Sequence, residues 1–144
     1  DLKRFDEARQ LFQRGVQADP SDAATYQAWA LMEKELKRFD EALEILGRGL
    51  QHVKGKDRAS LYALQGQIYA KKRQDSAAEA AFKAAINADE RDHYAQFYYA
   101  QFLKSRRRYD EACRHYRLAR QYYRRKPPWM PDQIKRDMKQ CGCE

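Results

Sequence analysis

A seven-residue segment near the start of the chain recurs without change 34 residues later. Residues 2–8 read Leu-Lys-Arg-Phe-Asp-Glu-Ala, and residues 36–42 repeat them. Looser copies lie at residues 75–78 and 108–112. The alanines that anchor the copies are spaced by 34, 36 and 34 residues: Ala8, Ala42, Ala78 and Ala112. A unit of this length is one helix-turn-helix, which buries its apolar face only by stacking on its neighbours. The repeat therefore predicts an all-α solenoid.

Apolar residues at i, i+3, i+4 and i+7 predict the helices of this array. The expected ranges are about 4–17, 23–35, 39–53, 59–72, 75–88, 93–105 and 109–124. Pro20 breaks the first helix, and Ser21 or Asp22 is the expected N-cap of the second. The turn at residues 55–57 is two residues longer than its counterparts, which accounts for the spacing of 36.

The array is expected to end at Pro127 and Pro128, since proline cannot continue a helix. An amphipathic segment at about residues 131–140 follows, with Ile134 and Met138 one turn apart. A solenoid needs such an element over its last apolar face, so we expect a capping helix there. The predicted organisation is a repeat array at 1–125, consisting of a truncated repeat at 1–20 and repeats at 21–56, 57–90 and 91–125, followed by a connection, capping helix and tail at 126–144.

The repeat resembles the tetratricopeptide repeat, whose units pair a helix A with a helix B. The family's small residue opening helix B matches the four anchoring alanines, and its large residue one turn later matches Phe12, Leu46, Phe82 and Tyr116. In helix A, the aromatic and small pair appears as Trp29-Ala30 and Tyr99-Ala100, whereas Gln65 departs from the pattern. The resemblance covers about residues 2–124. It implies a right-handed α-α superhelix of about three and a half repeats that serves as a protein–protein interaction scaffold.

One stretch favours a related family. Residues 28–33, with residues 11–15 before them, look like the half-a-tetratricopeptide variant found in RNA-processing scaffolds. This resemblance implies an alternative function, an RNA-associated scaffold that uses a basic surface.

In the tetratricopeptide family, helix A of each unit lines a concave groove. The side chains that the resemblance places there are Gln27, Lys34, Gln67, Lys71, Tyr94, Phe97, Gln101 and Lys104. Amides would bond the backbone of an extended peptide, aromatics would take its apolar side chains, and lysines would attract acidic groups. The alternative for Tyr94 and Phe97 is that they are buried contacts between repeats.

Family members that clamp the acidic tails of cytosolic chaperones use groove Lys and Arg with paired asparagines. This chain has one asparagine, Asn87, at the end of a B helix. The positions of the clamp read Gln27, Leu31, Leu64, Tyr94 and Tyr98. The sequence therefore excludes this binding mode.

The net charge of +8 comes from the last third of the chain. Residues 1–90 carry 15 Lys and Arg against 15 Asp and Glu, whereas residues 91–144 carry 14 against 6. A basic face is expected from Arg107, Arg114, Arg117, Arg120 and Arg124, with Tyr116, Tyr122 and Tyr123 interleaved. Arginine with aromatics is typical of surfaces that follow phosphates and stack bases. The same face could instead attract an acidic protein or remain solvated.

The sequence offers little for catalysis, and we expect no enzyme, cofactor or metal site. The three histidines are far apart in the repeat order, and Cys113 and His115 point to nearly opposite sides of one helix. The recurring Asp-Glu pairs, such as Asp40-Glu41, suit the positive end of helix B. No phosphate-binding loop or metal-ligand spacing appears.

Three cysteines do not make a disulfide framework. Cys113 is expected to be a small core residue, and Cys141 and Cys143 a reduced pair on a frayed tail. This favours a reducing, cytoplasmic location. No run approaches the roughly 18 apolar residues of a membrane span.

The first helix matches a helix B without its helix A, so we expect a fragment of a longer protein. The apolar face of that helix, including Phe5 and Phe12, is then open. Self-association through this face is expected in the fragment.

Overall fold

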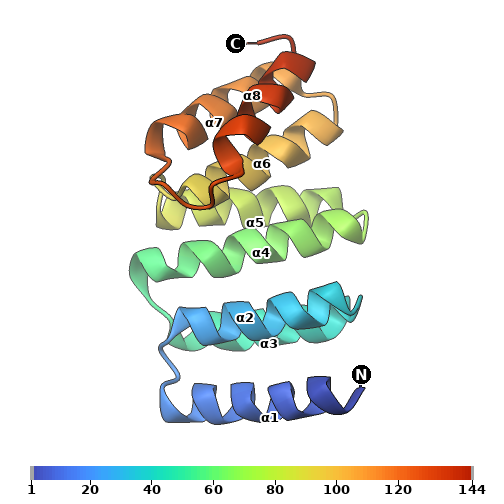
Figure 1. Ribbon diagram of the computed structural model, residues 1–144, viewed down its shortest axis with the longest axis vertical. Helices are drawn as coiled ribbons and strands as arrows, with labels where there is room; N and C mark the ends of the chain where they lie inside the picture. Colours follow the sequence, from blue (N-terminus) through green and yellow to red (C-terminus); the bar gives the residue numbers. More distant parts are fainter. Residues whose placement is uncertain (1, 144) are drawn as a thin grey trace.

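A computed structural model describes residues 2–143, which form a stack of antiparallel helix pairs with no β-strand in that range (Figure 1). The α-helices are α1 (Leu2–Ala18), α2 (Ala23–Glu35), α3 (Phe39–His52), α4 (Arg58–Lys71), α5 (Asp75–Ala88), α6 (His93–Ser105), α7 (Tyr109–Tyr122) and α8 (Met130–Gln140). A 3₁₀-helix, η1 (Gly55–Asp57), forms the longer turn. The predicted all-α solenoid is confirmed.

Figure 1 shows the pairs α2/α3, α4/α5 and α6/α7 as successive layers, with α1 at one end and α8 at the other. Small residues at the repeat positions let the paired helices approach closely. Ala42, Ala78 and Ala112 are fully buried. At Gly66 a Cβ atom would lie only 2.7 Å from the ring of Phe82, so no larger residue fits without movement of the ring. The repeat alanines and this glycine thus set the spacing between the two helices of a pair.

The turn from helix A to helix B has the same backbone form in all three pairs. A basic residue adopts a left-handed conformation there, with φ of 61° at Lys37, 63° at Arg73 and 62° at Arg107. The following amide donates back to the last turn of helix A, as from Arg108 to the carbonyl of Leu103 at 2.9 Å. Arg107, expected on the basic face, therefore lies in a turn.

Helix α8 packs on α7 at the end of the stack. Tyr116 of α7 donates its hydroxyl proton to Asp137 of α8 at 2.8 Å, and both residues are buried. Ile134 and Met138 also belong to this core, as the amphipathic pattern predicts. The helix expected at residues 109–124 ends earlier, at Tyr122, and the connection that follows carries Trp129 onto Phe97, with ring centroids 5.4 Å apart.

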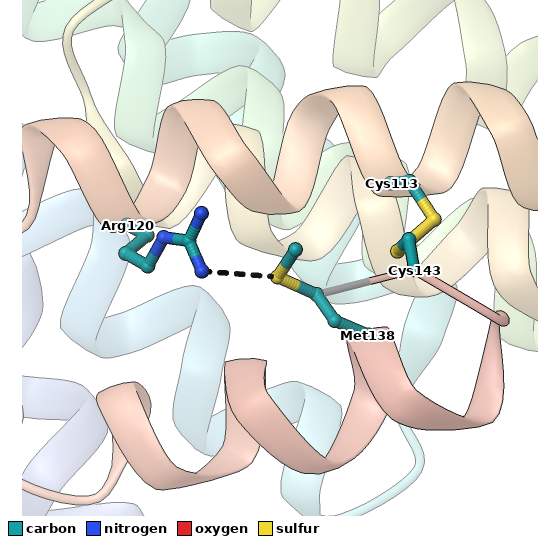
Figure 2. The surroundings of a disulfide bond; sticks show 4 residues. All are labelled: Cys113, Arg120, Met138 and Cys143. Carbon is teal, nitrogen blue, oxygen red and sulfur yellow. Dashed lines mark hydrogen bonds between the residues drawn. A yellow bond between two sulfur atoms is a disulfide. The ribbon is translucent and has the colours of Figure 1, made fainter.

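The expectation that Cys141 and Cys143 form a reduced pair on a frayed tail is wrong for Cys143. Cys113 of α7 and Cys143, beyond the end of α8, form a disulfide (Figure 2). Cys113 is buried, as expected, but Cys143 is held in place and does not lie on a frayed tail. The fold of α8 back along α7 brings together two residues that are 30 apart in the sequence. Cys141 remains the free cysteine of the described residues.

Within residues 2–143, no helix is both long enough and apolar enough to cross a membrane.

Candidate functional site

Side chains of α2 and α4 that the resemblance assigns to the groove lie next to one another. The Lys34 ammonium donates to the side-chain carbonyl of Gln67 at 3.5 Å. Burial lowers the pKa of Lys34, and the charge of Lys71 lowers it further, while Glu35 opposes this shift. Two ammonium groups and an amide thus share one surface, to which Gln27 adds a second, exposed amide. This set provides hydrogen-bond donors and positive charge together.

One expected groove residue belongs to the core instead. Phe97 is 1% exposed and packs against Tyr116 as well as Trp129. It is out of reach of a peptide on the surface because α8 and its preceding connection cover this side of α6. The alternative of a buried contact is therefore correct for Phe97.

Tyr94, in contrast, is 37% exposed. Its ring lies nearly parallel to that of Tyr98 one turn later, with centroids 6.4 Å apart. Burial raises the pKa of both phenols, so both remain neutral donors. We call this stacked pair of rings, Tyr94 and Tyr98, the aromatic step; Gln101, which is half-buried, follows on the same helix.

Lys104, another expected groove residue, is held by the capping helix. Its ammonium donates to Asp137 at 3.1 Å and contacts the side-chain carbonyl of Gln140. A hollow of about 500 Å³ remains between α6 and α8, with Gln101 and Tyr109 among its lining residues. The capping helix therefore neutralises the charge at this end of the predicted groove.

Two features of this surface lie outside the predicted set of groove residues. Leu31 is exposed on α2 at the repeat position of Gln67 and Gln101, a match that the register of the repeats would have revealed. A hollow of about 410 Å³ lies where α2 and α6 begin, and Asp22 and Asp92 are among its lining residues. These two aspartates cap their helices by accepting from the amides of residues 24 and 94.

The arginines of the expected basic face are exposed. Arg114, Arg117 and Arg124 make no hydrogen bond or ion pair with any of residues 2–143. Arg120 contacts the sulfur of Met138 at 3.8 Å. The interleaved aromatics are not comparably exposed, since Tyr116 is buried and Tyr122 and Tyr123 are half-buried. The face therefore offers cations with little ring surface for stacking bases.

Cys113 and His115 are both buried and have separate partners. The Nδ1 atom of His115 lies 2.7 Å from the side-chain carbonyl of Gln96, whose amide donates to the carbonyl of Glu90. Cys113 is in the disulfide. Residues 2–143 contain no cluster of His, Cys, Asp and Glu that could hold a metal ion.

The buried His115 predicts a loss of stability in mild acid. Burial, aided by the charge of Arg114 and opposed by Glu111, lowers its pKa from 6.5 to about 4. Between these values the unfolded chain binds the proton and the folded chain does not, so stability falls as the pH drops through this window. Urea unfolding should give about 2 kcal/mol less stability at about pH 5 than at about pH 7.5. His115→Gln should lose less over the same window, and an identical pH dependence in both proteins would exclude His115 as the cause.

Comparison with known proteins agrees with this architecture. Residues 59–92 match the family model described as tetratricopeptide repeat. The sequence matches no curated protein.

Several solved structures are similar in fold. YrrB is 18% identical with a TM-score of 0.63, and the match covers 97% of this chain and 69% of YrrB. MamA is also 18% identical, with a TM-score of 0.64 and coverage of 95% and 86%. PilF of Pseudomonas aeruginosa is 15% identical with a TM-score of 0.66, and the match covers 93% of this chain but only 64% of PilF. Residues 59–92 are therefore a tetratricopeptide repeat, within a chain that has the helical solenoid fold of tetratricopeptide-repeat proteins.

Proposed function

We propose that this chain is a non-catalytic scaffold that binds an extended peptide segment of a partner protein on the surface of α2, α4 and α6. The fold itself is that of protein-interaction scaffolds, which are generally not enzymes. The observation that carries the proposal is the contact of Lys34 with Gln67 across neighbouring A helices. It supports a row of polar side chains that runs from α2 to α4, and we propose that Gln101 of α6 extends this row.

The side chains of this row suit an extended peptide that carries acidic residues. Gln27, Gln67 and Gln101 offer both a donor and an acceptor to the groups of an extended chain. The carboxylate that pairs with Lys34, Glu35, lies 3.7 Å away and is itself exposed, and Lys71 forms no ion pair within residues 2–143. A carboxylate on the peptide would replace that weak pair with a charge-assisted hydrogen bond.

The aromatic step supplies the apolar part of the site. Tyr94 and Tyr98 stack on α6, the last of the three A helices of the row, and Tyr94 is exposed there. Large rigid aromatics contribute much of the binding energy in protein interfaces. A peptide with an acidic residue over α2 and α4 and an apolar residue over α6 would fit this arrangement. YrrB, similar in fold, is described as a TPR protein with an unusual peptide-binding site.

The proposal is tested with a peptide selected from a random display library against the protein. Fluorescence anisotropy then compares the original chain with the double variant Gln67→Ala/Lys71→Ala. We expect the dissociation constant to rise at least about tenfold, equivalent to about 1.4 kcal/mol. The matched control is Gln51→Ala/Lys83→Ala, which removes the same two side-chain types from exposed positions on α3 and α5.

The control variant should bind the peptide with an affinity within about twofold of the original, a difference well under 1 kcal/mol. Equal losses in both variants would argue against a site on the A helices. Loss of binding in the control alone would place the site on the B helices and contradict the proposal.

A further inference from the structure

The groove between α7 and α8 is a second surface, separate from the row on α2 and α4. It encloses about 650 Å³. Ile134 and Met138 lie beneath it and are each only 1% exposed, Pro131 is exposed beside them, and Cys143 closes one end through the disulfide to α7. Figure 2 shows Arg120 reaching from α7 toward Met138 of α8, with the disulfide farther along the same pair of helices. We call this surface the α7/α8 groove.

Helix α8 repeats one side-chain contact of the A-helix series. Lys34 of α2 contacts Gln67 of α4, and Lys104 of α6 contacts Asp137 of α8, with a separation of 33 residues in both cases. Every earlier A helix is followed by a B helix that packs along it, as α7 follows α6. No segment of residues 2–143 packs on α8 in that way. The α7/α8 groove is therefore shaped to receive one further helix.

The walls of the groove are basic. Arg120 lines it from α7, and Lys135 and Lys139 line it from α8, against a single carboxylate, Asp132. Arg117 and Arg124 lie three and four residues from Arg120, so helical geometry places them on the same side of α7. Both are exposed and make no hydrogen bond or ion pair within residues 2–143. This concentration of positive charge favours an acidic ligand.

The contacts of Arg120 give the most specific evidence for an acidic ligand in this groove. Its guanidinium contacts the thioether sulfur of Met138, which is a weak acceptor. A carboxylate at this position would form the short, charge-assisted bond that guanidinium groups make with planar anions. Movement of the exposed Arg120 side chain toward such a carboxylate would also uncover Met138 for apolar contact.

From the position of α8, the basic walls and the Arg120 contact over Met138, we propose that the α7/α8 groove binds an acidic amphipathic helix of a partner protein. The carboxylates of this helix would bind Arg120, Lys135 and Lys139. Its apolar face would lie over Pro131 and over Met138, which becomes accessible when Arg120 moves. A second copy of this chain that docked through α1 would fit less well, because α1 is itself basic, with Lys3, Arg4 and Arg14 among its charged residues. Nucleic acid fits less well because Tyr116 is buried and offers no ring for stacking bases.

The experiment uses a synthetic helical peptide of about 18 residues, long enough for about five turns. Leucines at i, i+3, i+4 and i+7 form one face, glutamates the other, and a fluorescein label reports binding by anisotropy. The double variant Lys135→Glu/Lys139→Glu reverses two exposed charges on the groove wall. The matched control, Arg14→Glu/Lys54→Glu, makes the same change in net charge at exposed positions far from α8.

We expect the groove variant to weaken binding at least about tenfold at low salt, because its new glutamates would repel the glutamates of the peptide. The control should change the affinity by less than about twofold, because its glutamates lie far from the groove and salt screens them. A peptide with lysine in place of glutamate should not bind. Amide hydrogen exchange should slow in residues 130–140 when the acidic peptide binds.

Four results would overturn the proposal. One is the absence of binding at about millimolar peptide, where even weak association is seen. Another is equal weakening in both variants, which would reflect net charge alone. A third is single-stranded RNA that displaces the peptide and depends on Lys135 and Lys139, which would make this a nucleic-acid surface. The fourth is dimerisation of the chain alone, seen by sedimentation equilibrium and lost in the groove variant, since the occupant would then be a second copy.

Discussion

Replacement of Phe97 by alanine is expected to lower the free energy of unfolding by about 3–5 kcal/mol. The ring is 1% exposed and packs between Tyr98, Tyr116 and Trp129. Its loss would leave a cavity at the junction of α6, α7 and the connection to α8. Because each layer of a solenoid contacts only its neighbours, the damage should concentrate at the C-terminal end of the stack.

Urea denaturation followed by circular dichroism measures this effect, and hydrogen exchange locates it. Tyr94→Ala is the matched control, since the Tyr94 ring is on the same helix but 37% exposed. Tyr94→Ala should lower the free energy of unfolding by no more than about 1 kcal/mol, because it removes little apolar area from the core. If Phe97→Ala were as stable as Tyr94→Ala, Phe97 would not be a core residue, and the original expectation of a groove residue would regain support.

Removal of the disulfide is expected to have an effect of similar size. Replacement of Cys143 by serine breaks the link to Cys113, which closes a loop with a sequence separation of 30 residues. In the chain-entropy model, a loop of this length stabilises the folded state by about 3–4 kcal/mol. The loss should appear first in α8, whose remaining contacts with the stack include Tyr116 with Asp137, Lys104 with Asp137, and the core around Met138.

Unfolding in urea with and without dithiothreitol separates the disulfide from other effects of the substitution. The original chain should lose stability on reduction, whereas Cys143→Ser should be insensitive to the reductant. Cys141→Ser is the control, since Cys141 is the free cysteine, and it should behave like the original chain in both conditions. If reduction left the original chain unchanged, the link would contribute nothing to stability.

The sequence determined the helices and their order because the repeat carries its own register. Seven residues copied 34 positions apart, together with alanines at the same offset, identify where each helix B begins and which face it buries. Helix ends were predicted to within one or two residues in most cases, since proline, aspartate caps and the apolar period act locally. The match of residues 59–92 to the tetratricopeptide repeat rests on the same local pattern.

The features that only the tertiary structure decided are at the C-terminal end of the stack. Helix α8 buries Phe97, neutralises Lys104 through Asp137, and brings Cys143 to Cys113. No copy of the repeat sequence marks α8, so the sequence predicted a capping helix but not which residues of the stack it contacts. Exposure of a groove residue depends on which element covers it, and disulfide pairing depends on distance in space. Local patterns along a chain specify secondary structure and the face that each helix buries, whereas contacts between residues 30 or more apart depend on how the last helix packs on the stack.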